Sequence, residues 1–120
     1  MLMLVDDEPD ILLMLEYYLT GRGFKFSSHT DPLKALADLK ENPSKYDLVL
    51  TDIRMPNMSG DELVNHIYLL NPKIKIVVMS AFEVHQEAKK NANANNCMVD
   101  FLQKPFSMTE FGYLLDKHLA

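Results

Sequence analysis

Three aspartates, a serine and a lysine stand in this sequence where they could together handle a phosphoryl group. Asp6 and Asp7 follow an apolar run, Asp52 and Ser80 each end another, and Lys104 comes just after a further one. Carboxylates brought close together resist joint ionisation, so three of them at one place favour a bound cation. Magnesium suits such oxygen ligands, because it commonly keeps several waters beside one or two carboxylates and a phosphate.

These residue types also suit a covalent reaction. An aspartate next to a magnesium ion can act as a nucleophile toward phosphorus and form an aspartyl phosphate. A lysine can then pair with the phosphoryl oxygens as a compact point charge. Each residue also has a plainer interpretation: Asp6 or Asp7 could cap the helix that follows, and Asp52 could orient its own loop. The plainer interpretations do not explain the combination, which favours phosphoryl chemistry.

The elements that must position these residues alternate between strand and helix. Short apolar runs predict five strands, at residues 1–5, 24–28, 47–52, 74–80 and 99–102. Helical periodicity and start signals predict five helices, at residues 10–20, 32–40 and 60–70, from near residue 84, and from residue 107 onward. Asp31, Ser59 and Ser107 are the expected N-caps of three of these helices.

The first predicted helix has an apolar stripe with the i, i+3, i+4, i+7 spacing. Its main members are Ile11, Met14, Leu15 and Tyr18, and Leu12 and Leu19 widen it. This stripe is the face that we expect to pack against the sheet.

A helix between each pair of apolar strands implies parallel pairing with right-handed crossovers. The predicted fold is therefore an α/β doubly wound sheet of five parallel strands, covered on both faces as a three-layer, flavodoxin-like sandwich. Ligands of such sheets bind outside the carboxyl ends of the strands, where the strand order reverses. The residues that could do chemistry all stand at those ends. A chain of 120 residues has the size of one domain, so residues 1–120 are predicted to be a single domain.

Composition excludes several other classes of protein. The chain is 48% apolar and 24% charged, the ordinary balance of a globular domain. Seventeen acids against twelve bases argue against direct binding of nucleic acid by this domain, because phosphate backbones need a basic surface. No apolar run reaches the roughly 20 residues of a membrane-spanning helix, and no signal peptide is recognised. With Cys97 as the single cysteine, a disulfide scaffold is excluded and a cytoplasmic location is expected.

Four motifs, in this order, resemble the receiver domain of two-component response regulators. They are Val5-Asp6-Asp7-Glu8; Thr51-Asp52-Ile53-Arg54-Met55-Pro56 with Ser59-Gly60; Ser80-Ala81; and Lys104-Pro105-Phe106. The resemblance covers essentially the whole chain, and the aspartate loop is its most specific part. It implies the strand order 2-1-3-4-5, which is the order known for the chemotaxis receiver.

The resemblance also implies roles for single residues. Asp52 would accept the phosphoryl group from a phosphohistidine on a sensor histidine kinase or a phosphotransfer protein. Asp6 and Asp7 would hold Mg²⁺, with Asp52 and the backbone carbonyl of Arg54 completing the protein ligands. Lys104 would pair with the phosphoryl group, and the bond from Lys104 to the following proline is often cis in this family.

Signal output is implied to depend on a switch pair. Ser80 would bond to the phosphoryl group, and Phe101 would turn inward when the hydroxyl moves. This change would remodel the surface of the fourth helix, fifth strand and fifth helix, where a downstream output protein or domain binds. A dimer formed on phosphorylation is a further partner state that the resemblance allows. The domain is not expected to be an enzyme beyond its own phosphorylation and dephosphorylation.

The sequence departs from the family pattern between Ser80 and Lys104. This stretch is about two residues longer than usual, and Cys97-Met98-Val99 replaces the usual glycine-alanine and acid. We therefore expect an unusual fourth helix. Phe82, two residues after the serine, is bulky enough to exclude water, which predicts slow self-dephosphorylation.

Two alternatives belong to other classes. One is a phosphorylation-independent pseudo-receiver that acts as a protein-interaction module, but such a module would lack an acid of the site or Lys104. The other is an enzyme on a similar fold, such as a flavin carrier or an aspartate-nucleophile phosphatase. The sequence has no glycine-rich phosphate loop, and Asp52-Ile53-Arg54 lacks the second aspartate of those phosphatases.

Overall fold

A computed structural model describes residues 1–81 and 98–119 of the chain. The strands in these ranges are β1 (Leu2–Val5), β2 (Phe26–His29), β3 (Leu48–Asp52), β4 (Lys75–Ser80) and β5 (Met98–Gln103). The helices are α1 (Pro9–Gly21), α2 (Pro32–Glu41), α3 (Gly60–Leu70) and α5 (Met108–Leu119). The helix predicted from near residue 84 lies outside the described residues. None of the described helices is long and apolar enough to cross a membrane.

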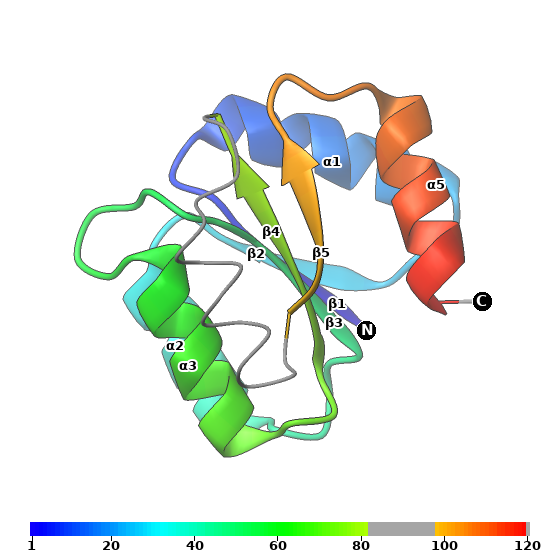
Figure 1. Cartoon of the computed structure of the whole chain (residues 1–120). Helices are drawn as coiled ribbons and strands as arrows, with labels where there is room; N and C mark the ends of the chain where they lie inside the picture. The colour runs from blue at the N-terminus through cyan, green and yellow to red at the C-terminus, as the bar shows by residue number, and fades with distance from the viewer. Residues whose placement is uncertain (82–97, 120) are drawn as a thin grey trace.

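All strand pairs are parallel, and the sheet order is β2-β1-β3-β4-β5. The order reverses between β1 and β3, so the carboxyl ends of these two strands flank the point where a ligand is expected. Helices α1 and α5 cover one face of the sheet, and α2 and α3 cover the other (Figure 1). The predicted doubly wound, three-layer fold and its strand order are therefore confirmed.

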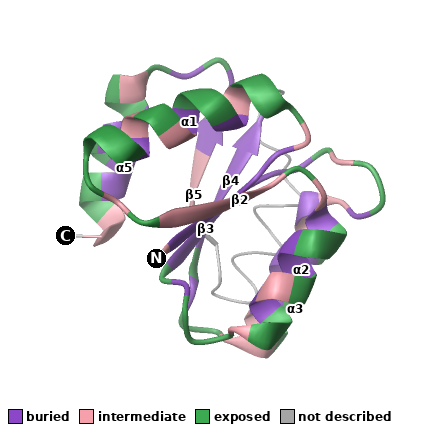
Figure 2. Ribbon diagram, turned by 180° about the vertical axis from the view of Figure 1, so that it is seen from behind, coloured by how far each residue is buried: buried purple, intermediate pink, exposed green. Residues whose placement is uncertain are grey.

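Successive residues of a strand belong to two separate hydrophobic cores, because the side chains of a strand alternate between the two faces of the sheet. Met3 and Val5 belong to the core beneath α2 and α3, whereas Leu2 and Leu4 belong to the core beneath α1 and α5. The central strands are buried on both faces, while the helices expose their outer faces (Figure 2). A parallel sheet covered on both sides requires such strands.

The predicted N-caps are confirmed by their hydrogen bonds. The Asp31 carboxylate accepts a hydrogen bond from the backbone N–H of Leu33 at 2.9 Å. The Ser59 hydroxyl accepts one from the N–H of Glu62 at 3.2 Å, and Ser107 accepts one from the N–H of Glu110 at 3.1 Å. These caps fix where α2, α3 and α5 begin, and hence the lengths of the loops that precede them.

The apolar stripe predicted for the first helix is confirmed except at Met14. Leu12, Leu15 and Leu19 of this stripe are buried, and Ile11 and Tyr18 pack against the same core. Met14, by contrast, is 38% exposed. This helix carries apolar residues on nearly every side, so periodicity alone could not determine which face packs on the sheet. The buried face is the one that contacts β1 and α5, because the buried residues of these three elements share one core.

Candidate functional site

The carboxyl edge of the sheet brings the predicted residues together. Asp6 follows β1, Asp52 and Ser80 are the last residues of β3 and β4, and Lys104 follows β5. The register pairs Asp52 with Met79 and places Ser80 opposite Gln103, so these strands end at nearly the same level. A cavity of about 160 Å³ opens there, lined by Asp7, Glu8, Asp52, Arg54, Ser80, Ala81 and Lys104.

Four acidic side chains meet at this cavity. Asp6, Asp7, Glu8 and Asp52 each offer a carboxylate oxygen, and the four oxygens lie within 4.8 Å of one another. Asp6 is fully buried and Asp52 is buried, so water screens their charges poorly. A set of hard oxygen donors at this spacing fits a divalent cation such as Mg²⁺.

Lys104 supplies the positive charge among these acids. Its Nζ lies 2.7 Å from Asp6 Oδ2, 3.4 Å from Asp52 Oδ2 and 3.7 Å from Glu8 Oε1. Burial alone would lower the pKa of Lys104, but the hydrogen bond to Asp6 and the surrounding carboxylates raise it above its ordinary value. Lys104 is therefore an ammonium at neutral pH and can pair with an anion that enters the cavity.

The backbone of β5 holds Lys104 at this position. The N–H of Lys104 donates a hydrogen bond to the carbonyl of Ser80 at 2.7 Å. The peptide bond between Lys104 and Pro105 is cis, as the family resemblance led us to expect.

Asp52 has an electrostatic environment that disfavours its charge. Burial raises the pKa of Asp52, and the neighbouring carboxylate of Asp6 raises it further. Lys104 and the backbone N–H of Ile53, which donates to Asp52 Oδ1 at 2.9 Å, only partly oppose this effect. A cation that enters the cavity would therefore stabilise the ionised form of Asp52.

The loop after β3 approaches Asp52 so closely that only glycine fits at position 60. The N–H of Gly60 donates to the carbonyl of Ile53 at 2.7 Å. A Cβ atom on Gly60 would lie 2.7 Å from Ile53 Cα and closer still to the carbonyl oxygen of Asp52. Gly60 therefore sets the path of the backbone that carries Asp52, a role that the motif alone did not reveal.

The plainer interpretations of the aspartates are only partly borne out. Asp6 Oδ1 accepts a hydrogen bond from the N–H of Glu8 at 3.0 Å, so Asp6 does support the local loop. The N-cap of α1, however, is Glu8, and its side chain makes no capping hydrogen bond. Asp52 bonds to the next backbone N–H and also faces Lys104.

The other predicted residues lie where they can contribute. Ser80 is buried and lines the cavity, and Arg54 is exposed at its margin. Phe101 is half-buried on β5 and packs against the core beneath α2 and α3. Phe82 and Cys97 lie outside the described residues.

Glu8 was not predicted as part of the site, although it directly follows the two aspartates.

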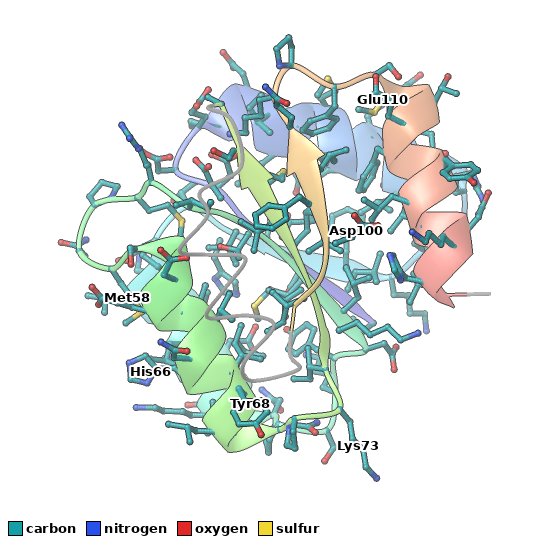
Figure 3. The ribbon with its side chains drawn as sticks, in the orientation of Figure 1. Met58, His66, Tyr68, Lys73, Asp100 and Glu110 are labelled. Atoms are coloured by element: carbon teal, nitrogen blue, oxygen red, sulfur yellow. The ribbon has the colours of Figure 1, made fainter. Side chains whose placement is uncertain are left out.

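Histidines do not contribute to this cavity in the described ranges. His66 lies on the exposed outer side of α3 (Figure 3). His29 bonds to Asp38 and His118 bonds to Asp100, both through Nε2 at 3.0 Å. These three are surface or partly buried structural residues, as expected, and His85 lies outside the described residues.

Comparison with known proteins agrees with this geometry. The family described as "Response regulator receiver domain" matches residues 2–115. The chain belongs to this family. It is a receiver domain of two-component response regulators, and the pseudo-receiver alternative is not favoured, since every expected acid and Lys104 are present and converge.

Relatives of this receiver domain include longer regulators. The transcriptional regulatory protein ZraR of Salmonella typhimurium is 33% identical over 119 residues, which cover 99% of this chain and 26% of ZraR. The DNA-binding transcriptional regulator NtrC of Klebsiella pneumoniae is 33% identical over 121 residues, covering 98% of this chain and 24% of NtrC. The receiver domain thus spans about a quarter of the length of these curated relatives.

Solved structures share the fold. The chemotaxis protein CheY4 of Vibrio cholerae superposes with a TM-score of 0.86 at 24% sequence identity, over 98% of this chain and 96% of that chain.

Proposed function

We propose that this receiver domain accepts a phosphoryl group on Asp52 from the phosphohistidine of a sensor histidine kinase or a phosphotransfer protein. The observation that carries the proposal is the placement of Asp52 in an acidic cavity with Lys104 Nζ 3.4 Å from its Oδ2. Asp52 supplies a nucleophile, and Lys104 supplies a counter-charge for the incoming phosphoryl oxygens.

Magnesium is the cofactor that this donor set fits. The carboxylates of Asp6, Asp7 and Asp52 and the backbone carbonyl of Arg54 would hold it. When bound, Mg²⁺ supplies the positive charge that lets a phosphoryl group approach these carboxylates.

The transfer itself requires little beyond positioning and charge neutralisation. A carboxylate oxygen of Asp52 forms a bond to phosphorus on the side opposite the histidine nitrogen, while the P–N bond breaks and its electron pair stays on the imidazole. Lys104 shifts from Asp52 to the phosphoryl oxygens, and the Ser80 hydroxyl donates a hydrogen bond to one of them. Hydrolysis of the acyl phosphate later releases inorganic phosphate and restores the Asp52 carboxylate.

Output follows from the charge that phosphorylation adds. Up to about two negative charges arrive in the cavity and draw the Ser80 hydroxyl toward them. Phe101, on the neighbouring strand, then occupies the space that is vacated. This shift favours the active one of two conformations, and the surface that includes β5 and α5 presents the difference to an output protein or domain.

The proposal extends to the partners of this receiver domain and to their location in the cell. Residues 1–120 form one domain, and its donor and output partners are cytoplasmic proteins or domains. Relatives such as NtrC are named as DNA-binding regulators, which supports a DNA-binding output module without direct nucleic acid binding by the receiver domain itself. A phosphorylation-dependent dimer is a further arrangement that the same surface would serve.

The test is labelling with phosphoramidate, a small donor with a P–N bond. We expect Mg²⁺-dependent labelling of the receiver domain on a phosphate-affinity gel and none with EDTA. Asp52→Asn should abolish labelling, whereas Asp10→Asn, a change of an exposed acid in the first turn of α1, should leave it intact. Full labelling of Asp52→Asn would refute the proposal.

A further inference from the structure

We propose that Glu8 contributes a fourth carboxylate to the cation site and thereby sets its affinity for Mg²⁺. This inference rests on the proposed function, because it concerns the same site. It goes beyond the ligands that the family resemblance implies, which are Asp6, Asp7, Asp52 and the backbone carbonyl of Arg54.

The position of the Glu8 carboxylate is the first reason. One of its oxygens lies within 4.8 Å of the ligand oxygens of all three aspartates. Its Oε1 is also 3.7 Å from Lys104 Nζ. The same ammonium group pairs with the buried carboxylates of Asp6 and Asp52. A positive charge is thus already bound where these acids meet, and Glu8 is one of the groups around it.

The backbone of Glu8 is the second reason. Glu8 is the N-cap of α1, a position where a side chain ordinarily accepts a hydrogen bond from the first turn of its helix. Glu8 makes no such bond, and instead its N–H donates to Asp6 Oδ1 at 3.0 Å. That bond fixes the backbone of Glu8 to a residue of the cation site, and the side chain extends toward Lys104 rather than back along α1.

The charge balance is the third reason. Four carboxylates surround a single ammonium, so the cavity has three negative charges in excess when every acid is ionised. A divalent cation reduces this excess to one. Removing the charge of Glu8 removes part of the attraction, and because Glu8 is 60% exposed, that part is moderate rather than large.

The experiment is calorimetric titration of the receiver domain with MgCl₂, without any phosphodonor. We expect Glu8→Gln to weaken Mg²⁺ binding by roughly tenfold, because a divalent ion doubles the modest attraction of an exposed ion pair. Asp10→Asn is the matched control: it removes an exposed acid two residues further along, outside the cluster, and should change the affinity less than about twofold. Glu8→Asp, which keeps the charge but shortens its reach, should fall between the wild type and Glu8→Gln.

The outcomes separate the two proposals. If the wild type binds Mg²⁺ and Glu8→Gln binds it as tightly as Asp10→Asn does, Glu8 has no part in the site and the inference is wrong. If Glu8→Asp binds Mg²⁺ as tightly as the wild type does, Glu8 acts only as a distant charge and not as a carboxylate of the cation site. That result would also overturn the inference. Failure of the wild type itself to bind Mg²⁺ would instead contradict the metal site of the proposed function. Circular dichroism of each variant confirms that the fold is retained.

Discussion

Substituting alanine for Gly60 tests how tightly the loop after β3 controls the position of Asp52. The added Cβ would lie 2.7 Å from Ile53 Cα, whereas ordinary van der Waals contacts begin at 3.4 Å, so the backbone must move by at least about 0.7 Å. Both atoms that crowd this Cβ most closely, Ile53 Cα and the Asp52 carbonyl oxygen, are backbone atoms and cannot swing aside. Overpacking of this kind costs about 1–3 kcal/mol in the free energy of unfolding.

The effect on phosphorylation should exceed the effect on folding. A misplacement of about 1 Å at a reacting group can slow a reaction roughly 100-fold, so a shift of about 0.7 Å should slow labelling of Asp52 by ten- to a hundredfold. The assay is the initial rate of labelling by phosphoramidate at saturating Mg²⁺, with urea unfolding measured on the same samples.

Gly21→Ala is the matched control for this prediction. Gly21 ends α1, and a Cβ there would meet nothing within 4 Å. Alanine favours a helix by about 1 kcal/mol over glycine, so Gly21→Ala should be as stable as the wild type or more stable, and should label at the same rate. Wild-type labelling and stability of Gly60→Ala would refute the reasoning, because they would show that the loop relaxes without moving Asp52.

Three further predictions concern stability. Burial and the neighbouring Asp6 raise the pKa of Asp52 on folding, so its ionised form opposes folding above that pKa. Asp52→Asn should therefore raise the melting temperature at pH 7, and the gain should disappear as the pH falls below the ordinary pKa of an aspartate, about 4. Lys104→Met leaves the buried Asp6 without its ammonium and should cost about 3 kcal/mol at pH 7, part of which added Mg²⁺ should restore; an unchanged melting temperature would contradict this. Tyr46→Phe removes the hydroxyl that donates to Asp38 Oδ2 at 2.6 Å and should cost about 1–2 kcal/mol in urea unfolding at pH 7. Burial would raise the pKa of Asp38, but bonds from Tyr46, His29 and Asn42 lower it overall, so its stabilisation is present at neutral pH and lost in acid; the loss caused by Tyr46→Phe should accordingly be smaller at pH 3 than at pH 7.

The sequence was sufficient to predict the residues that end the strands. Asp52 and Lys104 adjoin apolar runs, and parallel strands separated by helices must place such residues on one edge of the sheet. The order of the strands was not deducible from periodicity and came from the resemblance to receiver domains. The site was predicted because its position depends on the shared direction of the strands, which the alternation of strand and helix determines.

What the sequence did not reveal depends on contacts between distant segments. Glu8 joins the site because its side chain extends toward Lys104, which is 96 positions away in the chain. The network in which Tyr46 and His29 both bond to Asp38 links a loop, β2 and α2, and no local pattern indicates it. Met14 was assigned to the wrong side of α1 because that helix has apolar residues almost all around.

Identifying the residue that carries the phosphoryl group tests the central claim most directly. Borohydride reduces an aspartyl phosphate to homoserine, so a domain labelled with phosphoramidate and Mg²⁺, then reduced and digested, should yield a peptide with homoserine at position 52. We expect this product to form only when Mg²⁺ and the donor are both present. Homoserine at another aspartate, or labelling that survives on a histidine while position 52 remains aspartate, would contradict the account.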